Sequence, residues 1–331
     1  ILSKSLFTCS LFFSVLTQAQ DTFSIVAVDA VTGEVGSAVA PCVDLFSAGF
    51  TNDDFLGVLI PNVGAINTQA YYLPLNQTNA TTRMNAGDTP DEMIQWLVAN
   101  DVQNQPEVRQ YGIAALINGS PQTAAHTGSS TDNYKNHVLG TNYSIQGNIL
   151  LGQEVLDSME ARFLNEPGDL ACKLMAALQG ANMVGADTRC SSNGTSSLFA
   201  FVKVAQPTDV VGSPSFKASV RTQNNAGIEP IDSLQTKFNV LHSCSPLNIE
   251  ESEHFDDLFK VYPNPSSHYV TIENNTQDVY TVHLLDNTGR YIYTSTLTET
   301  TAIKTSNLTA GLYLLQLKNK TQTLVKKIII E

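Results

Sequence analysis

A threonine at the start of an apolar strand is the first residue of this chain that could carry chemistry. In "AQDTFSIVAVDA", Thr22 precedes a run of apolar and β-branched residues typical of a buried strand. A threonine hydroxyl attacks a carbonyl when a base lies beside it. The α-amine of a chain that begins with that threonine is such a base, because its pKa is about 8. This chemistry therefore requires Thr22 to be the first residue of the mature chain.

The segment before Thr22 is typical of a secretory signal peptide. Lys4 is followed by an apolar run and then by "TQA", a small-x-small cleavage signal that ends at Ala19. The apolar run is shorter than the roughly 20 residues of a membrane-spanning helix. We expect residues 1–19 to be a signal peptide, and a buried N-terminal helix is the alternative.

Cleavage after Ala19 would leave two residues, Gln20 and Asp21, in front of Thr22. The nitrogen of Thr22 would then be an amide and could not act as a base. The sequence therefore favours a threonine that only opens a strand, and a nucleophilic Thr22 is the alternative that depends on trimming.

Five more polar residues in the body could take part in acyl chemistry, and each has a structural alternative. His126 in "AAHTG" is a candidate base or a structural hydrogen-bonding residue. Gln146 and Asn148 in "QGN" could donate hydrogen bonds to a carbonyl, or they could belong to a tight turn. Asp187 and Arg189 in "GADTRC" are expected to form an ion pair, either in a cleft or as a structural contact.

The charge distribution argues against nucleic-acid and membrane-surface partners. The chain has a net charge of -13, and almost all of it lies in the body, where acidic residues outnumber basic ones. An acidic body repels phosphate backbones and anionic lipids. No phosphate loop, HExxH segment or EF-hand loop is present, so we expect no cofactor and no metal.

The mature chain would keep four cysteines, Cys42, Cys172, Cys190 and Cys244. An even number in an exported protein favours disulfides, and four cysteines allow three pairings. We expect Cys172 to pair with Cys190, because a helix followed by a returning loop brings them together. Buried free thiols are the alternative.

The body alternates strand and helix signals, and the tail contains strand signals only. Thr89, Pro90 and Glu92 form a capping box at the start of a helix. Asn118-Gly119 is a hairpin turn between two apolar runs. The pattern predicts hairpins at 22–40 and 109–128, a helix within 88–101 that begins at Pro90, helices at 153–164, 168–179 and 229–241, and further strands at 196–205 and 216–223.

Residues 248–258, "NIEESEHFDDL", are acidic and lack apolar periodicity, which predicts a linker. The domains are then a body at 20–247 and a small β-sandwich at 259–331. The turn of one tail hairpin is expected at Asp286–Gly289. The fold class is α+β with helices packed on sheets, followed by an all-β tail.

The body resembles the family known as domain of unknown function 1028 (DUF1028). The segments that carry the resemblance are "TFSIVAVDAVTGEVGSAVA", "GVLIPNVGAINTQA", "AAHTG", "YSIQGNILLGQEVLDSM", "PGDLACKLMAALQ", "GAD" and "EPIDSL". The resemblance implies a four-layer αββα sandwich like that of the N-terminal-nucleophile (Ntn) hydrolases. It implies no substrate.

Two departures from the threonine type of Ntn hydrolase weaken the catalytic interpretation. From Gln20 to Thr82 the chain has no Lys or Arg, and Pro41-Cys42 stands where relatives often have Ser-Lys. Such enzymes usually place a cation near the nucleophile. Here it would have to come from Arg83, Arg189 or another distant position.

The tail resembles the C-terminal sorting domain of the type IX secretion system of Bacteroidota, through "VYPNPSSHYVTIE", "LLDNTGRYIY", "LTAGLYLLQL" and "KKIII". This resemblance implies binding to that machinery and a secreted or outer-surface protein, and a generic β-sandwich module is the alternative. Two functions stay open for the body. One is a secreted amidohydrolase acting on a peptide or cell-wall fragment, and the other is a non-catalytic domain that binds a peptide or glycan.

Overall fold

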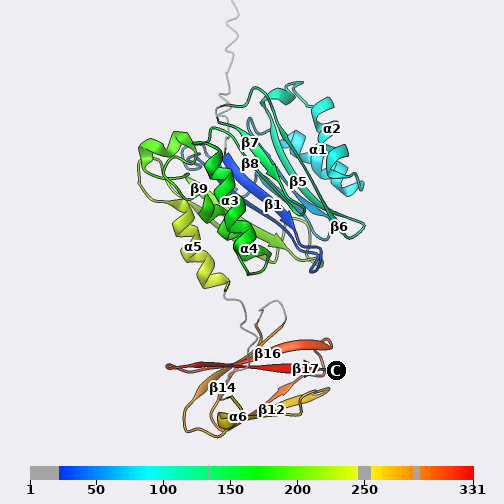
Figure 1. The fold of residues 1–331 in the computed structure, drawn as a ribbon, viewed down its shortest axis with the longest axis vertical. Coiled ribbons are helices and arrows are strands. Elements are labelled where there is room, and N and C mark those ends of the chain that lie inside the picture. Colours follow the sequence, from blue (N-terminus) through cyan, green and yellow to red (C-terminus); the bar gives the residue numbers. More distant parts are fainter. Residues whose placement is uncertain (1–21, 133, 245–254, 287–290) are drawn as a thin grey trace, which may run out of the picture. The chain divides into compact units, whose positions relative to one another are not determined.

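The computed structural model describes residues 22–132, 134–244, 255–286 and 291–331 (Figure 1). The chain divides into two units, residues 1–242 and 243–331, and each is described by itself. The expected signal peptide at residues 1–19 lies outside the described residues. Within the described part of the chain, no helix is long and apolar enough to cross a membrane.

A six-stranded antiparallel sheet forms one half of the first unit. The predicted hairpin at 22–40 lies at its centre and extends to Pro41, where Thr22 is opposite Pro41 and Val28 opposite Val35. Every strand neighbour in this sheet is antiparallel. In spatial order the strands are β10 (Phe216–Arg221), β9 (Phe199–Ala205), β2 (Val35–Pro41), β1 (Thr22–Val28), β8 (Tyr143–Gly147) and β7 (Asn136–Leu139).

A four-stranded antiparallel sheet forms the other half of the unit. Its predicted hairpin at 109–128 is confirmed, and Asn118 and Gly119 both have positive φ angles, 51° and 78°, as a two-residue hairpin turn requires. The strands follow one another in chain order: β3 (Gly57–Ile60), β4 (Gly64–Gln69), β5 (Gln110–Ile117) and β6 (Ser120–Thr127).

Helices contact both sheets, and the sheets contact each other. Strands β1 and β2 pack against β4, and β1 also packs against β5. The six-stranded sheet is contacted by α3 (Gln153–Asn165), α4 (Leu170–Gly180) and α5 (Pro230–Leu241). The four-stranded sheet is contacted by α1 (Pro74–Asn85) and α2 (Pro90–Ala99), as Figure 1 shows. Two short 3₁₀ helices, η1 (Pro106–Val108) and η2 (Thr188–Asn193), complete the unit.

Some helices of this unit are predictable from their local sequence, and others are not. The predicted capping box of α2 is present, since the Thr89 side chain accepts from the Glu92 N–H and the Glu92 carboxylate accepts from the Thr89 N–H. Helix α1 was not predicted, because its threonines and asparagines have low helix propensity. It buries Ala80 and Met84 against the four-stranded sheet, and this packing stabilises it.

The space between the sheets is apolar in one part and polar in another. Val26, Val28 and Val35 of the six-stranded sheet pack on Leu59, Ala65 and Ala114 of the other sheet. Toward the start of β1 the same space contains serine, asparagine and glutamine side chains. This polar part is the candidate functional site.

The second unit has two antiparallel sheets around one core, as expected for a small β-sandwich. Val270 and Ile303 of the three-stranded sheet share that core with Val282 and Leu315 of the four-stranded sheet. The strands are β11 (Phe259–Tyr262), β12 (Tyr269–Asn274), β15 (Thr300–Lys304) in one sheet, and β14 (Tyr291–Leu297), β13 (Tyr280–Leu285), β16 (Gly311–Lys318), β17 (Thr323–Ile330) in the other.

The predicted linker at 248–258 is wrong at its end. Residues 255–258 form the short helix α6 (Phe255–Leu258), and Phe255 is buried in the core of the second unit against Phe259. Burial of Phe255 fixes this acidic turn to the core, and the sequence has no periodic pattern there that predicts a helix. Residues 248–254 and the predicted turn residues 287–289 lie outside the described residues.

Candidate functional site

Thr22 lies at the start of β1 and is fully buried. Its hydroxyl donates to the carbonyl of Phe23 at 3.1 Å. Its own carbonyl accepts two hydrogen bonds, from the backbone N–H of Asn148 at 3.1 Å and from Nε2 of Gln69 at 3.2 Å. Because Gln69 belongs to the opposite sheet, these bonds tie the start of β1 to both sheets.

A network of buried amides surrounds Thr22. Ser24 donates to Oε1 of Gln69 at 2.6 Å and accepts from Nε2 of Gln146. Gln69 donates to Oε1 of Gln110 at 2.7 Å, and Nδ2 of Asn148 donates to the same oxygen at 2.8 Å. All five side chains belong to residues with at most 1% exposure. Since every member holds another, the network keeps the start of β1 rigid.

Gly112 of β5 leaves the space that Gln146 occupies. A Cβ atom at position 112 would lie 1.8 Å from Oε1 of Gln146, which also accepts from Ser144 at 2.8 Å. No side chain fits there unless the glutamine moves and breaks its bonds.

We expect Gly112→Ala to lower the free energy of unfolding of the first unit by about 1–3 kcal/mol, because overpacking displaces Gln146. Denaturant unfolding followed by the fluorescence of Trp96, the single tryptophan of the chain, measures this change. In a Gln146→Ala background, Gly112→Ala should leave the free energy of unfolding almost unchanged, because the glutamine side chain that it displaces is gone. An equal cost in both backgrounds would show that the clash with Gln146 is not the cause.

A second group of residues gathers at the same end of the sheet, where β2 ends opposite Thr22. Cys42 follows Pro41, and its N–H donates to Oδ2 of Asp187 at 3.1 Å. Asp187 is fully buried and pairs with Arg189, whose Nη2 lies 2.6 Å from Oδ2 and whose Nε lies 3.0 Å from Oδ1. The expected ion pair is therefore confirmed.

The expected disulfide between Cys172 and Cys190 is wrong. Cys190 pairs with Cys42, with their Cα atoms 5.7 Å apart and a sequence separation of 148. The bond joins the end of β2 to η2, a contact between distant segments that local sequence cannot reveal. Cys172 and Cys244 are also disulfide-bonded.

A family model described as a family of unknown function, DUF1028, matches residues 22–218. The chain belongs to the DUF1028 family. A crystal structure of a DUF1028 protein from Silicibacter pomeroyi is 21% identical, with a TM-score of 0.51, over 67% of this chain and 90% of that one. This likeness shows a shared fold. No curated protein matches the chain.

A second model, described as a secretion system C-terminal sorting domain, matches residues 260–331. This DUF1028 protein is therefore secreted or held at the cell surface, and its tail interacts with the type IX secretion machinery. A DUF3244 protein with an immunoglobulin-like β-sandwich from Bacteroides vulgatus is 19% identical, over 25% of this chain and 96% of that one. Its TM-score of 0.22 is too low to support an argument.

The structure does not bring His126 to the other candidates of the DUF1028 unit. His126 is opposite Tyr111 in the sheet, and its ring contacts the ring of Tyr111 on the face that α1 and α2 cover. Its Nε2 bonds the carbonyl of Pro106 at 2.8 Å. The next residue, Thr127, faces the amide network and bonds Nδ1 of His137 at 2.9 Å. Burial, together with His126, lowers the pKa of His137.

Two further cations can be assigned to other contacts. Arg83 pairs with Asp88 and lies over the ring of Trp96, on the helices that cover the far face of the four-stranded sheet. Lys203 of β9 is buried, and its Nζ donates to Asp54 Oδ2 at 2.9 Å and to the Gly57 carbonyl at 2.7 Å. Burial lowers the pKa of Lys203, and Asp54 partly opposes this effect. The fold brings Arg189 to Cys42, through the Asp187 carboxylate that accepts from the Cys42 N–H and through the adjacent Cys190.

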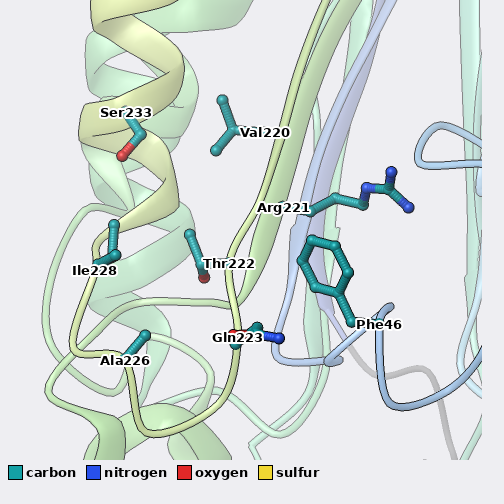
Figure 2. A pocket seen from close by; sticks show the side chains of 8 residues that line it. All are labelled: Phe46, Val220, Arg221, Thr222, Gln223, Ala226, Ile228 and Ser233. Carbon is teal, nitrogen blue, oxygen red and sulfur yellow. The ribbon is translucent and has the colours of Figure 1, made fainter.

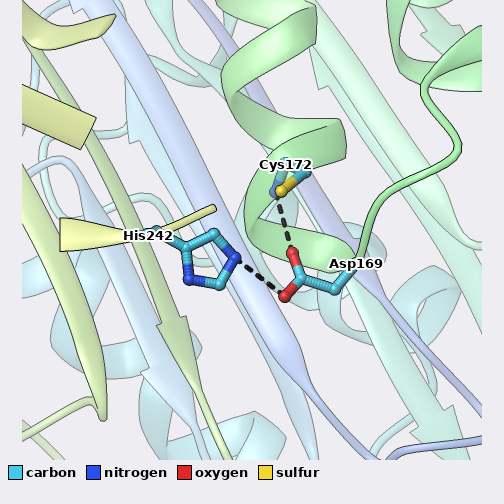
Figure 3. Close-up of side chains that lie close together, drawn as sticks. All are labelled: Asp169, Cys172 and His242. Atoms are coloured by element: carbon cyan, nitrogen blue, oxygen red, sulfur yellow. Dashed lines mark hydrogen bonds and ion pairs between the residues drawn. The ribbon is translucent and has the colours of Figure 1, made fainter. Parts of the chain in front are cut away.

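One group of side chains in the described residues has the spacing of a metal site. Asp169, Cys172 and His242 place their ligand atoms within 4.8 Å of one another (Figure 3). Asp169 caps α4 through the N–H of Cys172 and pairs with Nε2 of His242 at 2.9 Å. The sulfur of Cys172 is in a disulfide, so it is no thiolate ligand. These residues do not fit a metal.

Two surface hollows lie away from Thr22. The larger, of about 500 Å³, is formed by β10, the loop that follows it and α5, and Arg221 lies over the ring of Phe46 at its edge (Figure 2). The smaller, of about 330 Å³, lies beside Lys203, Phe55 and Tyr72. Neither is lined by Thr22, Asn148 or Arg189.

Sequence reasoning missed Gln69 and Gln110, which form the centre of the network. Gln69 stands in the family-like segment "INTQA", where alternation places Asn67 and Gln69 on one face of the strand. Polar residues at alternate positions of a wholly buried strand were the available signal. Gln110 has no comparable signal, because it opens β5 at a strand boundary.

Proposed function

We propose that the body is a secreted amide-bond hydrolase on an Ntn-hydrolase-like αββα sandwich, acting on peptides or cell-wall fragments. Thr22 is the nucleophile, and it acts once Gln20 and Asp21 have been removed. The observation that carries the proposal is the meeting of Thr22, Asn148 and the Asp187–Arg189 pair at one end of the six-stranded sheet.

The position of Arg189 removes the main objection from sequence. No Lys or Arg lies near Thr22 in sequence, but the bond between Cys42 and Cys190 and the acceptance by Asp187 of the Cys42 N–H hold Arg189 beside the strand end that faces Thr22. A guanidinium there stabilises the negative charge that develops on a carbonyl oxygen under attack. The side chain of Arg189 is 31% exposed, so an arriving substrate reaches it.

The reaction follows from the groups present. The Thr22 hydroxyl attacks the amide carbonyl and its proton passes to the neutral α-amine. The protonated α-amine then gives this proton to the leaving nitrogen as the C–N bond breaks. Water attacks the resulting ester in the same way and regenerates the hydroxyl.

Burial of Thr22 makes trimming the activating step. While residues precede Thr22, its nitrogen is an amide and its side chain has no exposed surface. Removal of the preceding residues creates the α-amine that the mechanism requires. The protein would thus stay inactive until after export, and its sorting tail is consistent with this order.

The test compares chains that begin at Gln20 and at Thr22. We expect only the chain beginning at Thr22 to hydrolyse peptide p-nitroanilides or peptidoglycan fragments, and Thr22→Ala to reduce that rate by about 10³-fold or more. Thr22→Ser is the matched control and should keep measurable activity. N-terminal sequencing of protein from culture medium shows which chain exists. A mature chain that begins at Gln20, with no activity from either form, would refute the proposal.

The alternative is a non-catalytic domain that binds a peptide or glycan. The pairing of Gln146 with Ser24 and Ser144 favours it, because this amide is fully buried and already bonded through both its nitrogen and its oxygen. Saturable binding of peptidoglycan fragments by the chain beginning at Gln20, unchanged by Thr22→Ala, would support this alternative.

A further inference from the structure

The side-chain oxygen of Asn148 is a buried acceptor whose partner is missing. Asn148 has no exposed surface, and Oδ1 has no hydrogen-bond partner among the described residues. Buried polar atoms are nearly always paired, so an unpaired one calls for an explanation.

The orientation of this amide is determined by its neighbours. Gln110 directs its Nε2 to the backbone carbonyl of Gly147 at 2.9 Å, so its Oε1 must face Asn148. That oxygen accepts from Nδ2 of Asn148. Exchanging the nitrogen and oxygen of Asn148 would put two oxygens together, so Oδ1 is the free atom.

The register of β1 and β8 places the backbone nitrogen of Thr22 opposite Asn148. Phe23 is opposite Gly147, so Thr22 is opposite Asn148. The Asn148 N–H donates to the Thr22 carbonyl. In an antiparallel pair bonded in this way, the N–H of the first residue points toward the same partner, and the two side chains lie on one face.

We propose that Oδ1 of Asn148 accepts a hydrogen bond from the α-amino group of Thr22 in the trimmed chain. This inference rests on the proposed function, since it assumes that Thr22 becomes the first residue. An internal Thr22 has one N–H, whereas a terminal ammonium has three, and the new donors meet the unpaired oxygen. Asn148 is then a positioning residue that holds the amine beside the threonine hydroxyl.

The test needs no catalysis. Four proteins combine two starts, Gln20 or Thr22, with the native Asn148 or the Asn148→Leu substitution, and their thermal unfolding is followed through Trp96. Trimming should raise Tm by about 2–4 °C more with asparagine than with leucine, since one such bond contributes a shift of that size in a unit this large. Asn148→Asp keeps an oxygen acceptor and should keep the difference. The effect on Tm of losing the hydrogen bond between Asn148 and Gln110 cancels in this double-mutant cycle, because both Asn148→Leu proteins lack that bond.

The outcomes separate this inference from the proposed function. If trimming changes Tm by the same amount in the Asn148 protein and in the Asn148→Leu protein, the role of Asn148 is overturned, whatever the hydrolytic activity. A clear difference with no amide hydrolysis would support the bond and refute the hydrolase. Hydrolysis by the trimmed Asn148→Leu protein at the rate of the trimmed native protein would also overturn a positioning role.

Discussion

Replacement of Cys42 and Cys190 by serine is expected to lower the free energy of unfolding of the first unit by about 2–5 kcal/mol. The bond closes a loop with a sequence separation of 148 residues, and a long loop gives a large stabilisation in the chain-entropy description. The measurement is guanidinium unfolding followed by Trp96 fluorescence, with protein purified under oxidising conditions.

The same change should also act on the candidate site. Without the disulfide, η2 loses its covalent link to the end of β2 and only the hydrogen bond from the Cys42 N–H to Asp187 is left of the two links described, so the Asp187–Arg189 pair should be held less firmly there. Replacing both cysteines by alanine is the matched control, because it separates loss of the bond from burial of a serine hydroxyl at Cys190. A free energy of unfolding within about 0.5 kcal/mol of that of the native protein would contradict the prediction, because so small a change is expected only for surface substitutions.

We expect Asp101→Asn to lower the free energy of unfolding of the first unit by about 3–5 kcal/mol, because it leaves Arg109 charged and buried without its partner. Nε of Arg109 lies 2.9 Å from Oδ2 of Asp101, and the two side chains are 3% and 0% exposed. Asp88→Asn is the control, since its pair with Arg83 is partly exposed and should contribute about 0–1 kcal/mol. Equal costs for the two substitutions would show that burial of the Arg109 pair does not matter.

The pair with Arg109 also predicts a loss of stability in acid. Burial by itself raises the pKa of Asp101, but hydrogen bonds from Arg109, the Gln105 N–H and Asn76 outweigh it and lower the pKa to about 2. A lowered carboxyl pKa gives stability above the unfolded value of about 4 that is lost as the pH falls to about 2.

Unfolding measured between pH 5 and pH 2 should therefore show a loss of roughly 2 kcal/mol from Asp101 alone, estimated from linkage. The Asp101→Asn protein lacks the titrating group and should have a flatter profile over this range. A profile parallel to that of the unchanged protein would assign the acid sensitivity to other carboxyls.

Elements with a strong local pattern were predictable. The hairpins of β1–β2 and β5–β6, the capping box of α2 and the helices α3, α4 and α5 all follow from periodicity, turn residues and caps. Helices α1 and α6 were not predictable, because each is stabilised by tertiary burial. Met84 is the buried residue in α1, and Phe255 is the buried residue in α6.

The candidate site was predictable only as a set of residue types. Thr22, Gln146, Asn148, Asp187 and Arg189 were identified from their segments, but nothing local says that they meet. The sheet register places Asn148 opposite Thr22 and Pro41 opposite Thr22 on its other side. The same register explains why His126 is elsewhere, since side chains alternate between the two faces of β6.

The sequence by itself determined the two-part organisation, the sorting tail and the family of the body, because these depend on segments of contiguous residues. Only the tertiary structure decided the partner of Cys190, the attachment of the Asp187–Arg189 pair to Cys42 and the unpaired oxygen of Asn148. Each of these depends on contacts between residues far apart in the sequence, and such contacts follow from sheet pairing and layer packing, which local patterns leave open.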